Sequence, residues 1–318
     1  MDIGPPDVGR PETSMTTPRA PRNPALETAG HTALAMLAFA ANSLLCRAAL
    51  AGGHADATSF TALRVAGGAV ALGLLARARG SPRAGGHFAW GSAVALFAYA
   101  IAFSLAYLRI PAGVGALLLF AAVQFTMIGA GLLAGERPRL VEWVGLCLSA
   151  AGLVVLTRPG LARPDPVGAL LMLGAGVAWG VYSLSRRRGA DAVAATAASF
   201  ARAVPLALGA CGLGALLGAM RLDTAGAFLA LASGAVASGL GYAVWYAALR
   251  GLTATRAAIV QLSVPPLAAI GGALVLGEGF SLRLVVASLL IVGGIALAVM
   301  GHRRRSPRGA QAVRSFRD

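Results

Sequence analysis

Three arginines lie inside long apolar stretches of this sequence, where a charged side chain is costly. Arg47, Arg64 and Arg202 are these residues. A guanidinium group offers a planar pair of N–H donors that matches a carboxylate, and charges inside membrane spans often mark a substrate path. The pattern predicts that Arg64 and Arg202 bind the anionic end of a substrate. Arg47 is a candidate for the same role. An equal alternative is that its side chain extends toward the lipid headgroups.

Uncharged polar and aromatic residues extend this candidate binding site. Amides can bond to a substrate or join neighbouring helices, and aromatic rings can line a pocket or form a belt at the membrane interface. The additional candidates are Asn42, Tyr99, Gln124, Trp179, Tyr182, Tyr242, Trp245 and Gln261. Tyr107 and Tyr246 lie near the ends of their stretches, so we expect them to be interfacial anchors.

Two consecutive prolines, Pro265 and Pro266, interrupt the ninth apolar stretch. Proline donates no backbone hydrogen bond, and carbonyls freed within a membrane are tolerated where they face a cavity. The pair therefore predicts a kink and is a candidate gate.

Acidic residues and histidines are absent from the deep part of every stretch. Glu136, Glu142 and Glu278 lie at the ends. A proton-coupled carrier usually needs a titratable group in its path, so facilitated diffusion or exchange is favoured, with Glu142 as the reserve candidate for coupling. No GxxxxGK[ST] segment is present, which argues against ATP-driven transport by this chain. The sequence predicts no metal site and no cofactor.

Ten apolar stretches of about 20 residues, each long enough to span a membrane, would position these side chains. The 318 residues are 57% hydrophobic and 12% charged, with a mean hydropathy of +0.74. A soluble domain carries about 25% charged residues. The runs lack the alternation of an outer-membrane barrel, so we expect an all-α integral membrane protein. The spans are placed at 32–50, 58–76, 88–108, 112–134, 140–157, 167–185, 195–219, 225–249, 257–276 and 282–300.

The second half of the sequence repeats the first. A shift of 142 positions brings Gly135-Glu136 onto Gly277-Glu278 and Gly152 onto Gly294. Five spans are an odd number, so the two repeats enter the membrane in opposite directions, and such inverted repeats hold a substrate site near the midplane. We expect two inverted five-helix repeats at 29–158 and 166–301, a disordered cytoplasmic tail at 1–28 and a basic cytoplasmic tail at 302–318.

The distribution of arginines predicts the orientation. All 27 basic residues are arginine, and the net charge is +15. With a cytoplasmic N-terminus, 19 of them fall in cytoplasmic segments, five on the other side and three inside spans. This is the positive-inside pattern, and it predicts a bacterial inner-membrane protein with both termini in the cytoplasm. Charge spread over loops disfavours a nucleic-acid partner, whereas the basic tail fits anionic membrane lipids.

Several segments in matching positions of the two halves resemble the drug/metabolite transporter superfamily, in its ten-helix EamA-type branch. They are Phe97–Tyr107 with Ile110–Leu118, Gly241–Arg250 with Thr255–Ala258, the Gly-Glu turns at 135–136 and 277–278, and Ala178–Tyr182. Arg64, Asn42 and Arg47 also fit the pattern, whereas Phe39 stands where a tryptophan is common. The resemblance covers about residues 31–301. It implies a metabolite carrier, commonly an exporter of amino acids or related compounds, and does not identify the substrate.

The expected function is therefore secondary transport of small metabolites by alternating access, with amino acids or other carboxylate-bearing compounds as the substrate. One alternative is proton-coupled efflux of drugs or other small solutes. A more remote alternative is a membrane-embedded lipid enzyme, which would need a cluster of His, Asp or Glu at a membrane face. The scattered histidines disfavour an enzyme. Expected partners are a small-molecule substrate and membrane lipids, and a homodimer is left open.

Overall fold

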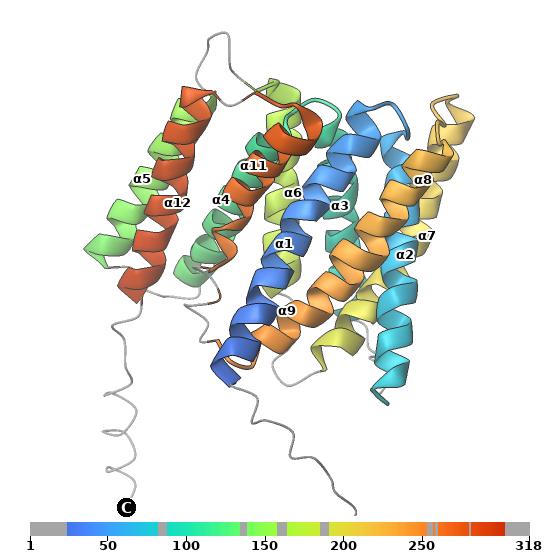
Figure 1. Cartoon of the computed structure of the whole chain (residues 1–318), viewed down its shortest axis with the longest axis horizontal. Helices are drawn as coiled ribbons and strands as arrows, with labels where there is room; N and C mark the ends of the chain where they lie inside the picture. The colour runs from blue at the N-terminus through green and yellow to red at the C-terminus, as the bar shows by residue number, and fades with distance from the viewer. Residues whose placement is uncertain are drawn as a thin grey trace, which may run out of the picture.

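The computed structural model describes residues 24–81, 88–133, 139–157, 164–184, 191–252, 257, 260–279 and 281–302. These residues form a helical bundle (Figure 1), and their only bridge of β type joins Ala55 to Leu222. The helices of the first half are α1 (Pro24–Ala51), α2 (Ala57–Ala78), α3 (Phe88–Tyr107), α4 (Ala112–Leu133) and α5 (Leu140–Thr157). Those of the second half are α6 (Pro166–Leu184), α7 (Ala192–Leu216), α8 (Thr224–Leu231), η1 (Ala232–Leu240), α9 (Gly241–Leu249), α11 (Val264–Leu276) and α12 (Leu282–His302).

The helices have the length and surface of membrane spans. Eight described helices are long and apolar enough to cross a membrane, with α8, η1 and α9 joined as the single helix Thr224–Leu249, and two further apolar helices are shorter. Leu170, Leu274 and Leu289 are 70%, 81% and 71% exposed. Such large apolar side chains on the outside suit lipid rather than water. The all-α fold with ten membrane helices is confirmed.

Two boundaries differ from the sequence-based expectation. Helix α1 begins at Pro24, so residues 24–28, assigned to the disordered tail, are helical. Proline suits a first helical turn because its missing N–H needs no partner there. At the other end α12 includes His302. The rest of both predicted tails, 1–23 and 303–318, lies outside the described residues.

The ninth span is also organised differently. Residues 257, 260 and 261 are helical, a turn follows at 262–263, and a new helix, α11, starts at Val264 with Pro265 and Pro266 in its first turn. The ninth span is therefore interrupted, as expected, but by the turn at 262–263 that precedes the prolines. The prolines occupy positions where a backbone donor would be unpaired in any case, so they start a helix rather than bend one.

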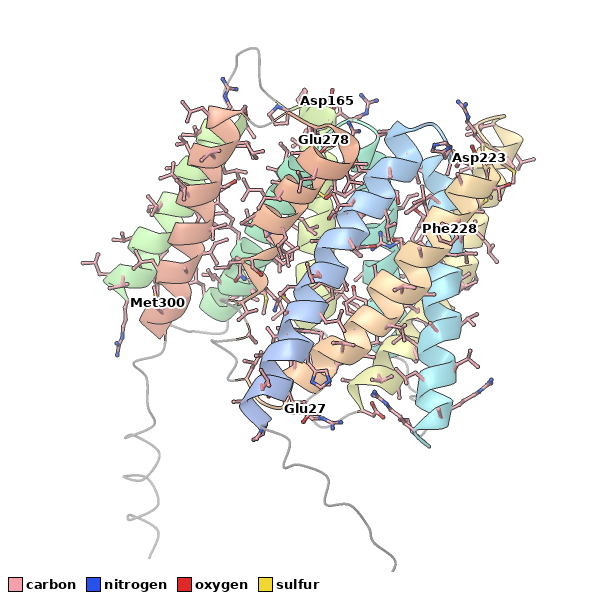
Figure 2. All side chains as sticks on the ribbon, in the orientation of Figure 1. Glu27, Asp165, Asp223, Phe228, Glu278 and Met300 are labelled. Atoms are coloured by element: carbon pink, nitrogen blue, oxygen red, sulfur yellow. The ribbon has the colours of Figure 1, made fainter. Side chains whose placement is uncertain are left out.

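The packing of the two halves is that of an inverted repeat. Helix α3 packs against α6, and its counterpart, the α8–η1–α9 helix, packs against α1. Helices α2 and α7 pack on each other, as do α5 and α12. In Figure 1 the α5–α12 pair stands at one side of the bundle. Glu27 and Met300 lie at one end of the molecule and Asp165, Asp223 and Glu278 at the other (Figure 2), so α1 starts at the end where α12 finishes.

Short connections join the halves at the end that carries Asp223. Asp56 caps α2 through Thr58 and Ser59 and also accepts a hydrogen bond from the backbone N–H of Arg221 at 3.0 Å. Burial pushes the pKa of the Asp56 carboxyl upward, but these hydrogen bonds outweigh it and lower the pKa to about 2. The carboxylate therefore ties the α1–α2 connection to the α7–α8 connection.

Candidate functional site

A central cavity of about 370 Å³ lies between the two halves. The first half lines it with residues of α1, α3 and α4, and the second half with residues of α6, η1, α9 and positions 257 and 261. The lining reaches Ser183 and Leu249, at the ends of α6 and α9, but on α1 it stops at Ser43. The cavity thus extends toward the end of the bundle that carries Glu27 and Met300. Beyond its other end, which we call the closed end, Cys46, Ala49 and Tyr107 are fully buried.

Aromatic rings form one continuous wall of this cavity. Trp179 stacks on Tyr242 with the ring centroids 5.5 Å apart and the planes inclined by 17°. Trp179 also contacts Tyr99 and Tyr182 at centroid distances of 4.9 and 5.1 Å. Phe39 on α1 contacts Tyr242 at 5.6 Å and so joins the wall to α1. Such a wall suits a ligand with an apolar part and fixes the width of the cavity.

Hydrogen-bonding groups gather toward the closed end. The Ser233 hydroxyl donates to Asn42 Oδ1 at 2.6 Å, which leaves the Asn42 nitrogen as the donor of that amide. Arg64 Nη2 donates to the Tyr99 hydroxyl at 2.8 Å. Among the described residues, Arg64 Nη1 and Ser238 Oγ are the buried side-chain atoms that lack a hydrogen-bond partner. Unsatisfied buried donors are rare and call for a ligand or a functional reason.

A π-helical segment, η1, holds this polar end together. It contains Ser233, Gly234 and Ser238. A side chain at Gly234 would collide with the backbone carbonyl of Arg64, so glycine is required for the close approach of η1 to α2. π-helical turns inside α-helices occur frequently at functional sites. Here the π segment places Ser233 and Ser238 beside α1 and the cavity.

Beyond the closed end, an ion pair joins four segments. Arg47 Nε donates to Glu278 Oε1 at 3.0 Å, and Arg47 Nη1 donates to the carbonyl of Tyr107 at 2.7 Å. Glu278 Oε2 accepts from the backbone N–H of Ala112, the first residue of α4, at 2.8 Å. The Arg47 and Glu278 side chains are 19% and 14% exposed. This ion pair ties α1 to the end of α3, the start of α4 and the turn after α11.

The structure brings together most of the residues that the sequence singled out. Those that line the cavity are Asn42, Tyr99, Gln124, Trp179, Tyr182, Tyr242, Trp245 and Gln261. The three arginines do not line it. Arg47 is engaged with Glu278, Arg64 is 2% exposed behind Tyr99, and Arg202 is half-buried on α7 with a bond to the carbonyl of Ala198. Pro265 and Pro266 also lie outside the lining.

Comparison with known proteins identifies the fold and its class. The EamA-like transporter family matches residues 31–158 and 166–300. The chain belongs to this family. It is therefore an EamA-like transporter of the drug/metabolite superfamily and a multi-pass membrane protein.

Relatives of this EamA-like transporter include proteins with and without an assigned substrate. An uncharacterized protein of Pseudomonas aeruginosa, PA1977, is 54% identical over 277 residues, which is 87% of this chain and 96% of that protein. The threonine/homoserine exporter RhtA of Escherichia coli is 31% identical over 206 residues, or 63% of this chain and 65% of RhtA. A solved crystal structure with 23% identity covers 85% of this chain and 98% of its own, with a TM-score of 0.62. That likeness concerns the fold alone.

The sequence analysis did not predict several lining residues of this transporter, among them Phe39, Ser43, Ser238 and Tyr246. Tyr246, expected to be an interfacial anchor, lines the cavity, and Tyr107, expected in the same role, is fully buried. The signal for Tyr246 is its position four residues after Tyr242, which places both on one helix face. Ser43 and Ser238 carry no such signal, because isolated serines in Ala/Gly-rich helices usually bond to their own backbone. Phe39 stands out in the sequence only as a departure from the family pattern.

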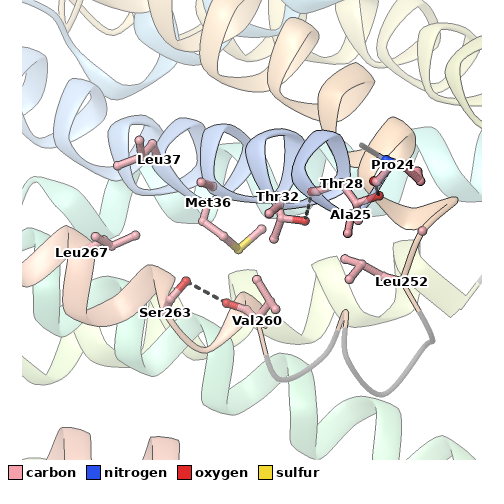
Figure 3. Close-up of a pocket in the computed structure, with 13 residues that line it drawn as sticks. Pro24, Ala25, Thr28, Thr32, Met36, Leu37, Leu252, Val260, Ser263 and Leu267 are labelled. Carbon is pink, nitrogen blue, oxygen red and sulfur yellow. Dashed lines mark hydrogen bonds between the residues drawn. The ribbon is translucent and has the colours of Figure 1, made fainter. Parts of the chain in front are cut away.

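A second hollow, of about 830 Å³, lies between the start of α1 and the start of α11 (Figure 3). Its few hydroxyls are engaged locally: Thr32 donates to the carbonyl of Thr28 at 2.7 Å, and Ser263 donates to that of Val260 at 2.7 Å. Most of the remaining lining is apolar. A site with few free polar groups and an apolar wall does not orient a polar metabolite, so the central cavity is the candidate functional site. The described residues hold no group of three or more His, Cys, Asp or Glu that could bind a metal ion.

Proposed function

We propose that this transporter exports small carboxylate-bearing metabolites, amino acids or close relatives, by alternating access. The observation that carries the proposal is the lining of the central cavity. It holds the amides of Asn42, Gln124 and Gln261 and several phenol and serine hydroxyls, and no Asp or Glu is among its described residues. Donors without a competing carboxylate favour an anionic group over a cationic one.

The size of the cavity and one relative support this substrate class. Pockets for small metabolites start at about 300 Å³, and the central cavity has about 370 Å³. The relative RhtA is described as a threonine/homoserine exporter. A hydroxyl-bearing amino acid would place its carboxylate on the donors and its aliphatic part on the aromatic wall.

The orientation that we propose places both termini in the cytoplasm, as the arginine distribution favours. The central cavity then extends toward the cytoplasm and is closed on the outer side, which is the state that loads substrate for export. A reporter that is active only outside the cytoplasm, fused to the C-terminus, tests this orientation. Strong reporter activity would contradict it.

Counterflow in proteoliposomes tests the transport activity. Vesicles with purified protein are loaded with one unlabelled amino acid from a panel that includes threonine and homoserine, and entry of the same labelled compound is followed. We expect saturable exchange that does not require a pH gradient, because no carboxylate is among the described residues that line the cavity. Uptake only under an imposed pH gradient, or exchange of organic cations but no carboxylates, would contradict the proposal. Growth rescue by overexpression in the presence of inhibitory amino acids tests the export direction.

A further inference from the structure

Arg64 is placed behind the cavity wall rather than in it. Its side chain is 2% exposed, and its guanidinium carbon lies 4.7 Å from the ring centroid of Phe103 and 5.2 Å from that of Tyr99. Among the described residues no carboxylate pairs with it, and Nη1 has no hydrogen-bond partner. A buried cation without a counter-ion is strongly unfavourable. Packing alone therefore does not explain an arginine at this position.

The positive charge of Arg64 acts on the cavity through the hydroxyl group of Tyr99. Tyr99 lines the cavity, and its hydroxyl oxygen accepts the hydrogen bond from Arg64 Nη2 at 2.8 Å. A phenol has one proton to donate as well as lone pairs that accept. Because Arg64 occupies an acceptor position, the proton of Tyr99 is left for a second partner. A donor polarised by a neighbouring cation forms a stronger hydrogen bond, above all to an anion.

Two more donors lie at the same closed end. Ser238 Oγ is buried, lines the cavity and has no partner among the described residues. Asn42 is oriented by Ser233 and keeps its amide N–H groups. Tyr99, Ser238 and Asn42 together resemble a preorganised anion site. Their neutral donors face the ligand, and the fixed positive charge of Arg64 lies behind them.

We propose that Tyr99, Ser238 and Asn42 form the subsite for the substrate carboxylate, and that Arg64 is a positioning residue which orients and polarises Tyr99 without touching the substrate. This inference rests on the proposed transport of carboxylate-bearing metabolites and names the part of the cavity that recognises the carboxylate. It replaces the expectation that Arg64 itself binds the anion.

A double-mutant cycle separates the indirect role from direct binding. Counterflow is measured for the amino acid that the wild-type protein exchanges best, with its primary amide as a competitor that lacks the carboxylate. We expect Tyr99→Phe and Arg64→Gln each to raise the half-saturation concentration of the amino acid about tenfold and to leave inhibition by the amide nearly unchanged. The double variant should have the same half-saturation concentration as the single variants, because both changes remove one shared interaction.

The contrary outcomes are equally specific. If the two effects multiply to about a hundredfold, Arg64 binds the substrate directly and the inference is overturned. If Tyr99→Phe weakens the amino acid and the amide equally, Tyr99 does not recognise the carboxylate. Ser104→Ala is the control on the same helix, since its hydroxyl donates to the carbonyl of Ala100 and accepts from Thr61, and it does not line the cavity. It should leave the ratio between amino acid and amide unchanged.

Two further measurements keep the test decisive. If Arg64→Gln does not fold, as judged by size-exclusion chromatography, Tyr99→Phe and Ser238→Ala still test the subsite. Both must raise the half-saturation concentration of the amino acid and leave inhibition by the amide unchanged, which is the selective loss. Absence of that loss in both variants overturns the subsite. Failure of the proposed function is visible separately, because the wild-type protein would then exchange no carboxylate-bearing compound at all.

Discussion

Ser149 and Ile291 occupy the same position in the two halves of the chain and contact each other. They are 142 residues apart, which is the shift that aligns the repeats, and the Ser149 hydroxyl donates to the carbonyl of Ile291 at 3.2 Å. Two equivalent residues can meet only close to the symmetry axis that relates them. The internal two-fold axis of the inverted repeat therefore passes through the contact of α5 with α12.

Glycines permit this contact. A Cβ at Gly294 would lie 2.5 Å from both the carbonyl oxygen of Gly145 and the hydroxyl of Ser149, and a Cβ at Gly145 would in turn meet the carbonyl of Gly294. Small residues that let two helix backbones touch are typical of membrane helix pairs. The axis is thus marked by a backbone contact and not by a salt bridge.

Gly294→Ala should separate α5 from α12. The added methyl group meets backbone atoms that cannot rotate away, and such overpacking destabilises by about 1–3 kcal/mol. The neighbouring Gly293 has open space where a Cβ would be, so Gly293→Ala should be neutral or slightly stabilising through its better helix propensity. Thermal unfolding of the purified variants in detergent compares the two. Equal midpoints for both variants would show that the helix contact is not tight.

Gly234→Ala should abolish transport. The new Cβ would collide with the carbonyl oxygen of Arg64, so η1 must move from α2 and shift the polar end of the cavity. Gly174→Ala on α6 is the control, because nothing lies within 4 Å of a Cβ there. Counterflow at matched protein density measures both. Wild-type rates for Gly234→Ala would mean that the close approach of η1 to α2 is dispensable.

Much of the architecture could be predicted from the sequence, because it depends on averages over about 20 residues. The ten spans follow from hydropathy. Most of the aromatic wall could be predicted because aromatic residues are only 6% of the chain and several lie within the spans. The pairing of Arg47 with Glu278 spans 231 positions and leaves no local trace, so the sequence leaves Arg47 between substrate binding and extension toward the lipid headgroups.

Other features depend on backbone details that hydropathy does not contain. The π segment η1 has the sequence ASGAVASGL. Its residues are small, and their apolar periodicity is too weak to indicate the i→i+5 hydrogen bonds of a π-helix. For Arg64, the cost of burial indicates only that some group must offset the charge. Whether that group is a substrate or Tyr99 depends on how α2 packs against α3, which brings Arg64 to Tyr99. The sequence therefore indicated the residues of the site but not which of them face the cavity.

Breaking the ion pair of Arg47 and Glu278 should destabilise the closed side of the bundle. Glu278→Gln removes the charge partner of a largely buried guanidinium, which is more harmful than removing both charges. We expect the double variant Arg47→Gln/Glu278→Gln to lose less free energy of unfolding than the two single variants lose together. The difference, which is the coupling energy, should be about 0.5–3 kcal/mol. Unfolding midpoints of the four proteins measure this coupling. Additive effects would indicate that the two side chains act independently.

Acid should weaken the connection formed by Asp56. Its pKa is lowered to about 2 in the folded protein, whereas an unfolded aspartate titrates near ~3.9. A depressed pKa contributes stability that is complete above the unfolded value and is lost as the pH falls from about 4 to about 2. Asp56→Asn keeps a helix-capping side chain but cannot titrate, so its unfolding midpoint should change less over this range than that of the wild type. Glu27→Gln, at an exposed position in the first turn of α1, is the control and should follow the wild-type curve. Parallel curves for Asp56→Asn and the wild type would show that the Asp56 carboxylate does not contribute to the acid sensitivity.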